Sequence, residues 1–294
     1  MTKAKVYTLL LKKEDEEKLF SLFHEYAHIA PQYAKWQLRL ENCVITCYNS
    51  GKTVFQGKDA YIYAAKYDAS IVDNQPKEGR KNIYPQAGSD EVGTGDYFGP
   101  ICVCATYIHP TQVKALESLP IQDSKAITDK LILEVAPILM QQLKHSLLIV
   151  SNDKYNEVHV TNNMNQIKAK LHNQAFINLE KKVELPEFII VDQFTPETSY
   201  YRYLQKERKV INHIHFETKA ESKYLSVAAS SMIARYAFLK EMEKMNEKYQ
   251  LDFPLGASDK VDLFAIEFIN QYGIEELQHV AKMHFKNTEK ILND

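Results

Sequence analysis

Four acidic residues stand where a sheet could bring carboxylates together: Asp90, Glu91, Asp192 and Glu221. The first two end a strand-like segment, the third follows the apolar run 188–191, and the fourth precedes a long helical pattern. Carboxylate oxygens are the ligands that Mg²⁺ and Mn²⁺ prefer. Two such ions about 4 Å apart can activate a water and stabilise the leaving oxygen of a phosphodiester. Together the four acids predict a catalytic site for divalent cations.

Each of these acids taken alone also has an ordinary structural interpretation. Asp90 and Glu91 fit an exposed turn, because glycines follow them. Asp192 fits the N-cap of a helix that begins after Pro196, and Glu221 fits a first helical turn, where the helix dipole favours negative charge. Neighbours on a regular strand also point to opposite faces. Asp90 and Glu91 therefore reach one site only if their strand twists or ends there.

The segment 84–294 must position these acids, and its pattern alternates between strands and helices. Strand-like runs cover 87–92, 98–108, 146–151, 188–192 and 210–216, and helical periodicity covers 128–143, 164–182 and 222–249. Such alternation predicts an α/β domain in which a mixed sheet carries helices on both faces. Open sheets of this kind bind ligands at the carboxyl ends of their strands. Asp192 would stand at such an end.

Residues 1–68 predict a separate, small α+β domain of order β-α-β-β-β-α. Its strands are expected at 6–11, 33–40, 44–48 and 53–55, and its helices at 13–27 and 58–67, with a hairpin turn at 49–52. Residues 69–83 contain Pro76 and Gly79 among polar residues, which indicates a linker. We therefore expect an N-terminal substrate-binding domain, a linker, and a catalytic domain over 84–294.

Charge is unevenly distributed along a chain whose net charge is -2. Residues 1–66 are mildly basic, so they could neutralise phosphates through Lys3, Lys5, Lys35, Arg39, Lys52 and Lys58. Trp36 or Tyr48 could stack on a base or sugar, although packing in the core is the competing interpretation of Trp36. Charge imbalance alone decides nothing, because solvated surfaces commonly show it.

The overall composition is that of a globular protein. The 294 residues are 45% hydrophobic and 25% charged, which excludes disordered and collagen-like classes. No apolar stretch approaches about 18 residues, so no membrane span is expected. Cys43, Cys47, Cys102 and Cys104 lack zinc-site spacing and are expected to be buried thiols in a reducing compartment. We expect a cytoplasmic monomer.

Four segments resemble the motifs of the type 2 ribonuclease H family, in matching order over about residues 84–285. They are AGSDEVGTGDYFGP at 87–100, Asp123-Ser124-Lys125, FIIVDQF at 188–194, and KAE at 219–221 followed by SVAASSMIAR at 226–235. The chain is similar to the HIII branch of this family, because it has Gly93-Thr94-Gly95, Glu221 and an extra N-terminal domain. That domain is similar to one repeat of the TATA-binding protein fold.

The resemblance implies an endoribonuclease that hydrolyses the RNA strand of RNA/DNA hybrids and leaves 5′-phosphate and 3′-hydroxyl ends. It implies two Mg²⁺ or Mn²⁺ ions, held by the catalytic carboxylates Asp90, Glu91, Asp192 and Glu221. It implies that the backbone of Gly93-Thr94-Gly95 contacts 2′-hydroxyls, the group that distinguishes RNA from DNA. It further implies phosphate contacts by Ser124 and Lys125, and positive charge near the phosphate from Lys219.

Two other functions stay open at this stage. A protein that binds hybrids without cutting them would need one of the four carboxylates displaced from the site, and none is missing from the motifs. A nuclease or strand-transfer enzyme acting on DNA would use similar acids, but the G-T-G and D-S-K segments argue against it. The preference between Mg²⁺ and Mn²⁺, and cleavage at a single ribonucleotide within DNA, do not follow from the sequence.

Overall fold

The computed structural model describes residues 5–40, 43–57, 60–64, 66–68, 80–121 and 128–293. Contacts between residues divide the chain into two compact units, 1–77 and 78–294. Most of the predicted linker and the whole D-S-K segment, including Ser124 and Lys125, lie outside the described residues.

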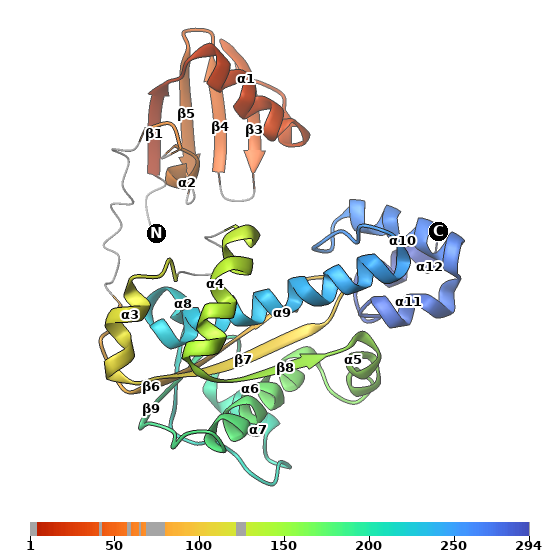
Figure 1. Ribbon diagram of the computed structural model, residues 1–294. Helices are drawn as coiled ribbons and strands as arrows, with labels where there is room; N and C mark the ends of the chain where they lie inside the picture. The colour runs from red at the N-terminus through yellow and green to blue at the C-terminus, as the bar shows by residue number, and fades with distance from the viewer. Residues whose placement is uncertain are drawn as a thin grey trace. The chain divides into compact units, whose positions relative to one another are not determined.

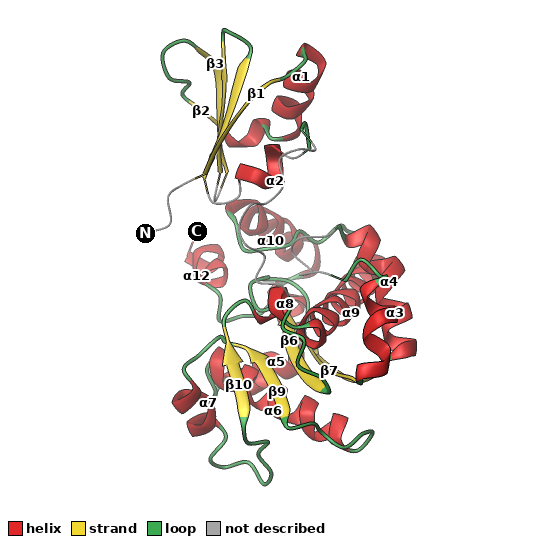
Figure 2. Ribbon diagram, turned by 90° about the vertical axis from the view of Figure 1, so that its left-hand side faces the viewer, coloured by secondary structure: helices red, strands yellow, loops and turns green. Residues whose placement is uncertain are grey.

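The first unit is a five-stranded antiparallel sheet with two helices on one side (Figure 2). Its strands lie in the order β1 (Lys5–Leu10), β5 (Lys52–Gly57), β4 (Cys43–Tyr48), β3 (Ala34–Leu40) and β2 (Ala27–His28), with helices α1 (Lys13–Leu22) and α2 (Ala60–Ala64). Leu19 of α1 packs on Leu38, Ile45 and Phe55 of the sheet. The predicted α+β order is therefore present, with the two-residue β2 added.

The helix expected over 13–27 was predicted too long. It ends at Leu22, and a short 3₁₀ turn at His24–Tyr26 leads into β2, where Ala27 pairs with Leu38. The apolar spacing through Tyr26 and Ala27 resembled a helix, but pairing with the sheet edge decides the backbone there. Local periodicity cannot reveal such a pairing, because the partner strand lies later in the chain.

The second unit is built on a mixed five-stranded sheet, as predicted. Its strands lie in the order β10 (Ile214–Glu217), β9 (Phe188–Asp192), β6 (Gln86–Val92), β7 (Ile101–Ile108) and β8 (Lys144–Val150). The β10–β9 and β9–β6 pairs are parallel, whereas β6–β7 and β7–β8 are antiparallel. The strand expected over 98–108 begins only at Ile101, because Phe98 instead forms a bridge to Ala281.

Helices cover both faces of this second sheet (Figure 1). The long helix α9 (Leu225–Tyr249) packs on β6 and β7 with α4 (Asp129–Gln142) beside it, and α6 (Met164–Glu180) packs on the opposite face against β7 and β8. The remaining helices are α3 (Val113–Glu117), α5 (Asn152–His159), α7 (Glu197–Tyr203), α8 (Ala220–Lys223), α10 (Asp259–Tyr272), α11 (Ile274–Val280) and α12 (Lys286–Asn293). Each face of the sheet therefore has its own buried core.

Close packing of α9 on the sheet depends on small residues. A side chain at Gly88 would stand 2.4 Å from the Ser226 hydroxyl and 2.7 Å from the Val227 backbone nitrogen. Only glycine fits at this distance, so the backbone of β6 lies directly against the start of α9. Among the described helices, none combines the length and the apolar character needed to cross a bilayer. All four cysteines are buried, as predicted.

Candidate active site

Asp90 and Asp192 lie side by side on the α9 face of the sheet. The parallel β6–β9 register pairs Ser89 with Val191, so these acids occupy the next positions on the two strands. Gly88 contacts α9, and alternation along the strand places Asp90 on the same face, where its carboxylate accepts a hydrogen bond from Ser231. Two predicted site residues are therefore neighbours.

The surroundings of Asp90 disfavour a negative charge on its own carboxyl group. Its side chain is only 9% exposed, and burial raises its pKa well above the usual value. The charges of Glu91 and Asp192 raise that pKa further, against the hydrogen bond from Ser231. A divalent cation would relieve this repulsion, so the donor set suits Mg²⁺ or Mn²⁺ in its chemistry.

Asp192 also anchors the short helix α8, which carries Glu221. Its Oδ1 accepts a hydrogen bond from the backbone nitrogen of Ala220 at 2.9 Å. Glu221 follows directly and is buried. The alternative interpretation of Asp192 as the cap of the next helix is wrong, since Pro196 occupies the N-cap position of α7. Lys219 begins α8 in the left-handed region, with φ 56°, and its side chain is exposed.

Glu217 holds the other side of α8 and was missed by sequence reasoning. It pairs with Asp192 across the β10–β9 register, and it accepts hydrogen bonds from Lys223 and Tyr224, both at 2.6 Å, and from Lys81 at 2.9 Å. Burial alone would raise the pKa of Glu217, but these donors outweigh it and lower the pKa. Because Lys81 contacts Glu217, at least this residue of the predicted linker packs on the second unit.

Glu91 faces the opposite side of the sheet from Asp90. Its two carboxylate oxygens are bound by Lys168 and by His172 Nε2, the latter at 2.7 Å, both from α6. Burial alone would raise the pKa of Glu91, but the hydrogen bond from His172 and the charges of His172 and Lys168 lower it to about 2. Lys168 and His172 were not predicted. A detectable signal existed, because the two residues lie four apart on the buried face of a helical pattern.

Glu91 also lies where the sheet opens. Pairing of β6 with β9 stops at Ser89, whereas pairing with β7 continues to Val92. The strand edge at Glu91 is therefore not covered by β9. Neighbouring residues on a regular strand point to opposite faces, and the strand end at Glu91 relaxes this constraint only in part, since the Glu91 carboxylate still binds α6. Among the described residues, no three His, Cys, Asp or Glu side chains converge closely enough to hold an ion as they stand.

The Gly93-Thr94-Gly95 loop follows directly. Gly93 has φ +93°, and a side chain there would stand 2.2 Å from the carbonyl oxygen of Pro100, so glycine is required by the backbone. Gly95 is different: it is exposed, and a methyl group added to it would meet no other described atom within 4 Å. The loop therefore has a constrained start and an open end that another molecule can approach.

A buried lysine anchors the backbone that follows this loop. Lys282 is fully buried, and its Nζ donates to the carbonyl oxygens of Asp96 at 2.8 Å, Phe98 at 3.4 Å and Gly99 at 2.5 Å. Burial lowers the pKa of Lys282 to about 7, against the opposing charge of Asp96. The C-terminal segment thus fixes the exit of the loop, a contact that sequence reasoning did not predict.

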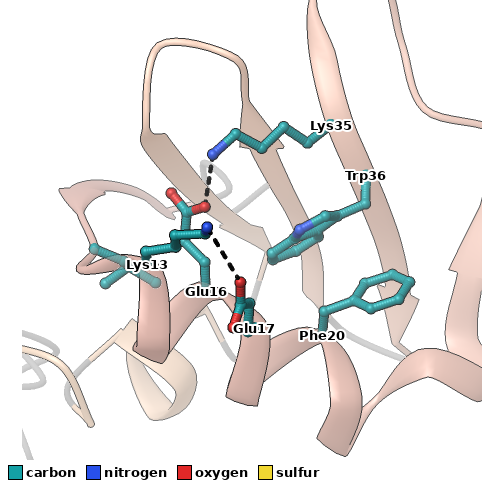
Figure 3. A pocket seen from close by; sticks show the side chains of 7 residues that line it. Lys13, Glu16, Glu17, Phe20, Lys35 and Trp36 are labelled. Atoms are coloured by element: carbon teal, nitrogen blue, oxygen red, sulfur yellow. Dashed lines mark hydrogen bonds and ion pairs between the residues drawn. The ribbon is translucent and has the colours of Figure 1, made fainter.

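The predicted binding residues of the first unit have different surroundings. Trp36 is half-buried beside Phe20, with ring centroids 5.5 Å apart, so the core interpretation of Trp36 holds. It lines a pocket of about 570 Å³ in which Lys35 is paired with Glu16 (Figure 3). Arg39 is exposed and donates to Gln37 at 3.1 Å. Lys3 and Lys58 lie outside the described residues.

The chain is similar to known proteins over nearly its whole length. A family model described as Ribonuclease HII matches residues 87–288, and one described as a domain of unknown function (DUF3378) matches residues 7–79. Ribonuclease HIII of Staphylococcus haemolyticus is 39% identical and covers 99% of this chain and 97% of its own. Ribonuclease HIII of Listeria monocytogenes is 42% identical, covering 84% of this chain and 85% of its own.

Solved structures agree with these sequence relatives. Bst-RNase HIII in complex with Mn²⁺ is 36% identical, with a TM-score of 0.69 and coverage of 98% of both chains. The ribonuclease H2 from Pyrococcus horikoshii OT3 is 24% identical, with a TM-score of 0.60 over 71% of this chain and 97% of its own. The latter likeness shows the fold alone. The predicted fold class is confirmed.

Proposed function

Because the chain belongs to the ribonuclease HII family, and within it to the ribonucleases HIII, we propose that it cuts the RNA strand of RNA/DNA hybrids with two divalent cations bound by Asp90, Glu91, Asp192 and Glu221. The observation that carries this proposal is the placement of Asp90 beside Asp192 on parallel strands, with α8 hydrogen-bonded to Asp192. The Mn²⁺ bound by Bst-RNase HIII supports the choice of cation.

The acids and their neighbours would hold the cations and orient the scissile phosphate. Asp90 and Asp192 would supply oxygens from one face, Glu221 would supply one from α8, and Glu91 would supply one from the open edge of β6. The chemistry that bound Mg²⁺ or Mn²⁺ would supply is activation of the attacking water and neutralisation of the leaving 3′ oxygen. Cleavage on that side of the phosphate leaves 5′-phosphate and 3′-hydroxyl ends.

The loop at Gly93-Thr94-Gly95 would provide selectivity for RNA. Its backbone groups can contact 2′-hydroxyls where Gly95 leaves the approach open. Lys219, exposed at the start of α8, would add positive charge near the phosphate. We propose phosphate contacts by Ser124 and Lys125 on the family resemblance alone.

The decisive experiment uses one labelled strand in three duplexes: RNA/DNA, DNA/DNA, and DNA with one ribonucleotide. Each duplex is incubated with the protein in EDTA, Mg²⁺ or Mn²⁺, and the product ends are mapped. We expect cutting of the RNA/DNA hybrid only when a cation is present. Binding of the hybrid without cutting in either metal would contradict the proposal and favour a hybrid-binding protein. Cutting of DNA/DNA would favour a DNA nuclease.

We further propose that residues 1–68 form a substrate-binding domain. Exposed Arg39 and Lys52 lie on its strands and can approach nucleic-acid phosphates. Deleting residues 1–66 should therefore raise KM for the hybrid far more than it lowers kcat, provided that circular dichroism shows the remainder folded. An unchanged KM in the folded truncation would remove this assignment.

A further inference from the structure

We propose that Lys168 and His172 of α6 are positioning residues that hold Glu91 and set the cation affinity of the site in opposite directions. Lys168 weakens cation binding by balancing the charge of Glu91, and His172 strengthens it by orienting the same carboxylate. The inference rests on the proposed cation site. It adds a regulating pair from a helix that carries none of the four acids.

The contacts form a built arrangement in the protein interior. Each oxygen of the Glu91 carboxylate has its own partner, Oε1 with Lys168 and Oε2 with His172 at 2.7 Å. His172 is fully buried, and Lys168 is 8% exposed. A buried lysine that keeps an ion pair to one acid is not a solvated surface charge, so its position is set by the fold.

Two further contacts fix the pair. The other ring nitrogen of His172, Nδ1, lies 2.7 Å from the Ser89 hydroxyl, so both nitrogens are engaged. Phe194 stacks on the His172 ring with centroids 5.4 Å apart, and Lys168 Nζ lies 4.0 Å from the centre of the same Phe194 ring. Because Phe194 follows Asp192 by two residues, one aromatic ring connects the end of β9 to this pair.

The two residues act on the site by different physical routes. The Lys168 ammonium places a positive charge beside the Glu91 carboxylate. A cation that approaches the same carboxylate is repelled by that charge. His172 also adds positive charge beside Glu91, but it restricts the rotation of that carboxylate through a directed hydrogen bond. Such supporting bonds typically change metal affinity by about 10- to 100-fold, which exceeds the effect expected of the charge. Loss of the charge and loss of the orientation should therefore have opposite signs.

The test measures Mn²⁺ binding to the full chain without nucleic acid, by calorimetry and by the electron paramagnetic resonance of free Mn²⁺. We expect Lys168→Gln to tighten Mn²⁺ binding by on the order of fivefold and His172→Ala to weaken it by about tenfold. His172→Gln, which keeps a donor, should recover most of the loss. Lys170→Gln is the matched control, because Lys170 lies on the same helix and pairs with Glu207 instead.

Thermal unfolding checks that each variant is folded. If His172→Ala does not fold, the lysine variants decide alone, since Lys168→Arg keeps the charge and should keep the wild-type affinity. Equal affinities in wild type, Lys168→Gln and His172→Ala would overturn the inference while leaving the proposed function intact. Shifts of the same sign in both would also overturn it. Absence of Mn²⁺ binding by the wild-type protein would instead overturn the proposed function, and this inference with it.

Discussion

Asp90 and Glu91 are neighbours in the chain, yet their side chains lie on opposite faces of the sheet and their pKa values shift in opposite directions. Asp90 faces α9 beside Asp192, and burial among negative charges raises its pKa. Glu91 faces α6, where partners of opposite charge overcome burial and lower its pKa to about 2. One step along a strand reverses the direction in which a side chain points. The comparison teaches that burial alone does not decide the charge of a carboxylate.

In the proposed cation site, the two faces of the sheet would have different roles. On the α9 face, the negative charge of Asp192 lies close to Asp90 and raises its pKa. On the α6 face, the charge of Glu91 is already balanced. A divalent ion therefore has most to gain on the α9 face, while the α6 face supplies a carboxylate of fixed orientation.

The largest expected effect comes from removing charge on the α9 face. Asp90→Asn or Asp192→Asn should lower kcat for hybrid cleavage by about 10³-fold or more, because a cation ligand loses its charge. Steady-state kinetics with unchanged circular dichroism would establish it. Cleavage within tenfold of wild type by Asp192→Asn would remove this acid from the catalytic site.

A second prediction is that substitutions of Glu91 and Asp90 change the free energy of unfolding differently. Glu91→Gln leaves Lys168 buried without its counter-charge, and breaking such a pair should cost about 3 kcal/mol of unfolding free energy. Asp90→Asn removes a repelled charge, so stability in EDTA should be unchanged or higher. Urea unfolding of both variants measures the contrast. Equal destabilisation by the two substitutions would break the comparison.

The smallest expected effect tests whether polar partners alone can keep a buried group charged. Lys282 is surrounded by carbonyl oxygens, and its pKa is lowered to about 7. Above pH 7 the folded chain releases a proton that unfolded lysine keeps up to about pH 10, so stability should rise with pH. The expected slope is about 1 kcal/mol per pH unit between pH 7 and 9.

Urea unfolding across this pH range, with Lys282→Met as the control, isolates the contribution of Lys282. The wild-type slope should exceed that of the variant, since other groups titrate in both proteins. Equal slopes would mean that the three carbonyl oxygens hold the ammonium charged. Carbonyls would then be equivalent to the opposite charges that keep Glu91 ionised.

The sequence alone predicted the candidate acids and the glycine loop, and it determined most of the element order. These features are local: alternation of apolar residues encodes strands, helical spacing encodes helices, and the residues within each motif lie close together in the chain. The boundaries at 13–27 and 98–108 were predicted wrongly, because the partners that decide them, Leu38 and Ala281, are distant in sequence. The strand expected over 210–216 also differs, since it begins only at Ile214.

Only the tertiary structure decided which face each acid occupies and what surrounds it. Glu91 and His172 are 81 residues apart, Lys81 and Glu217 are 136 apart, and Lys282 and Asp96 are 186 apart. No local pattern specifies such pairs, since they arise when the parallel and antiparallel strands assemble and the helices close over them. The sequence shows which residues are acidic, but the charge states of these acids depend on neighbours that only folding brings together.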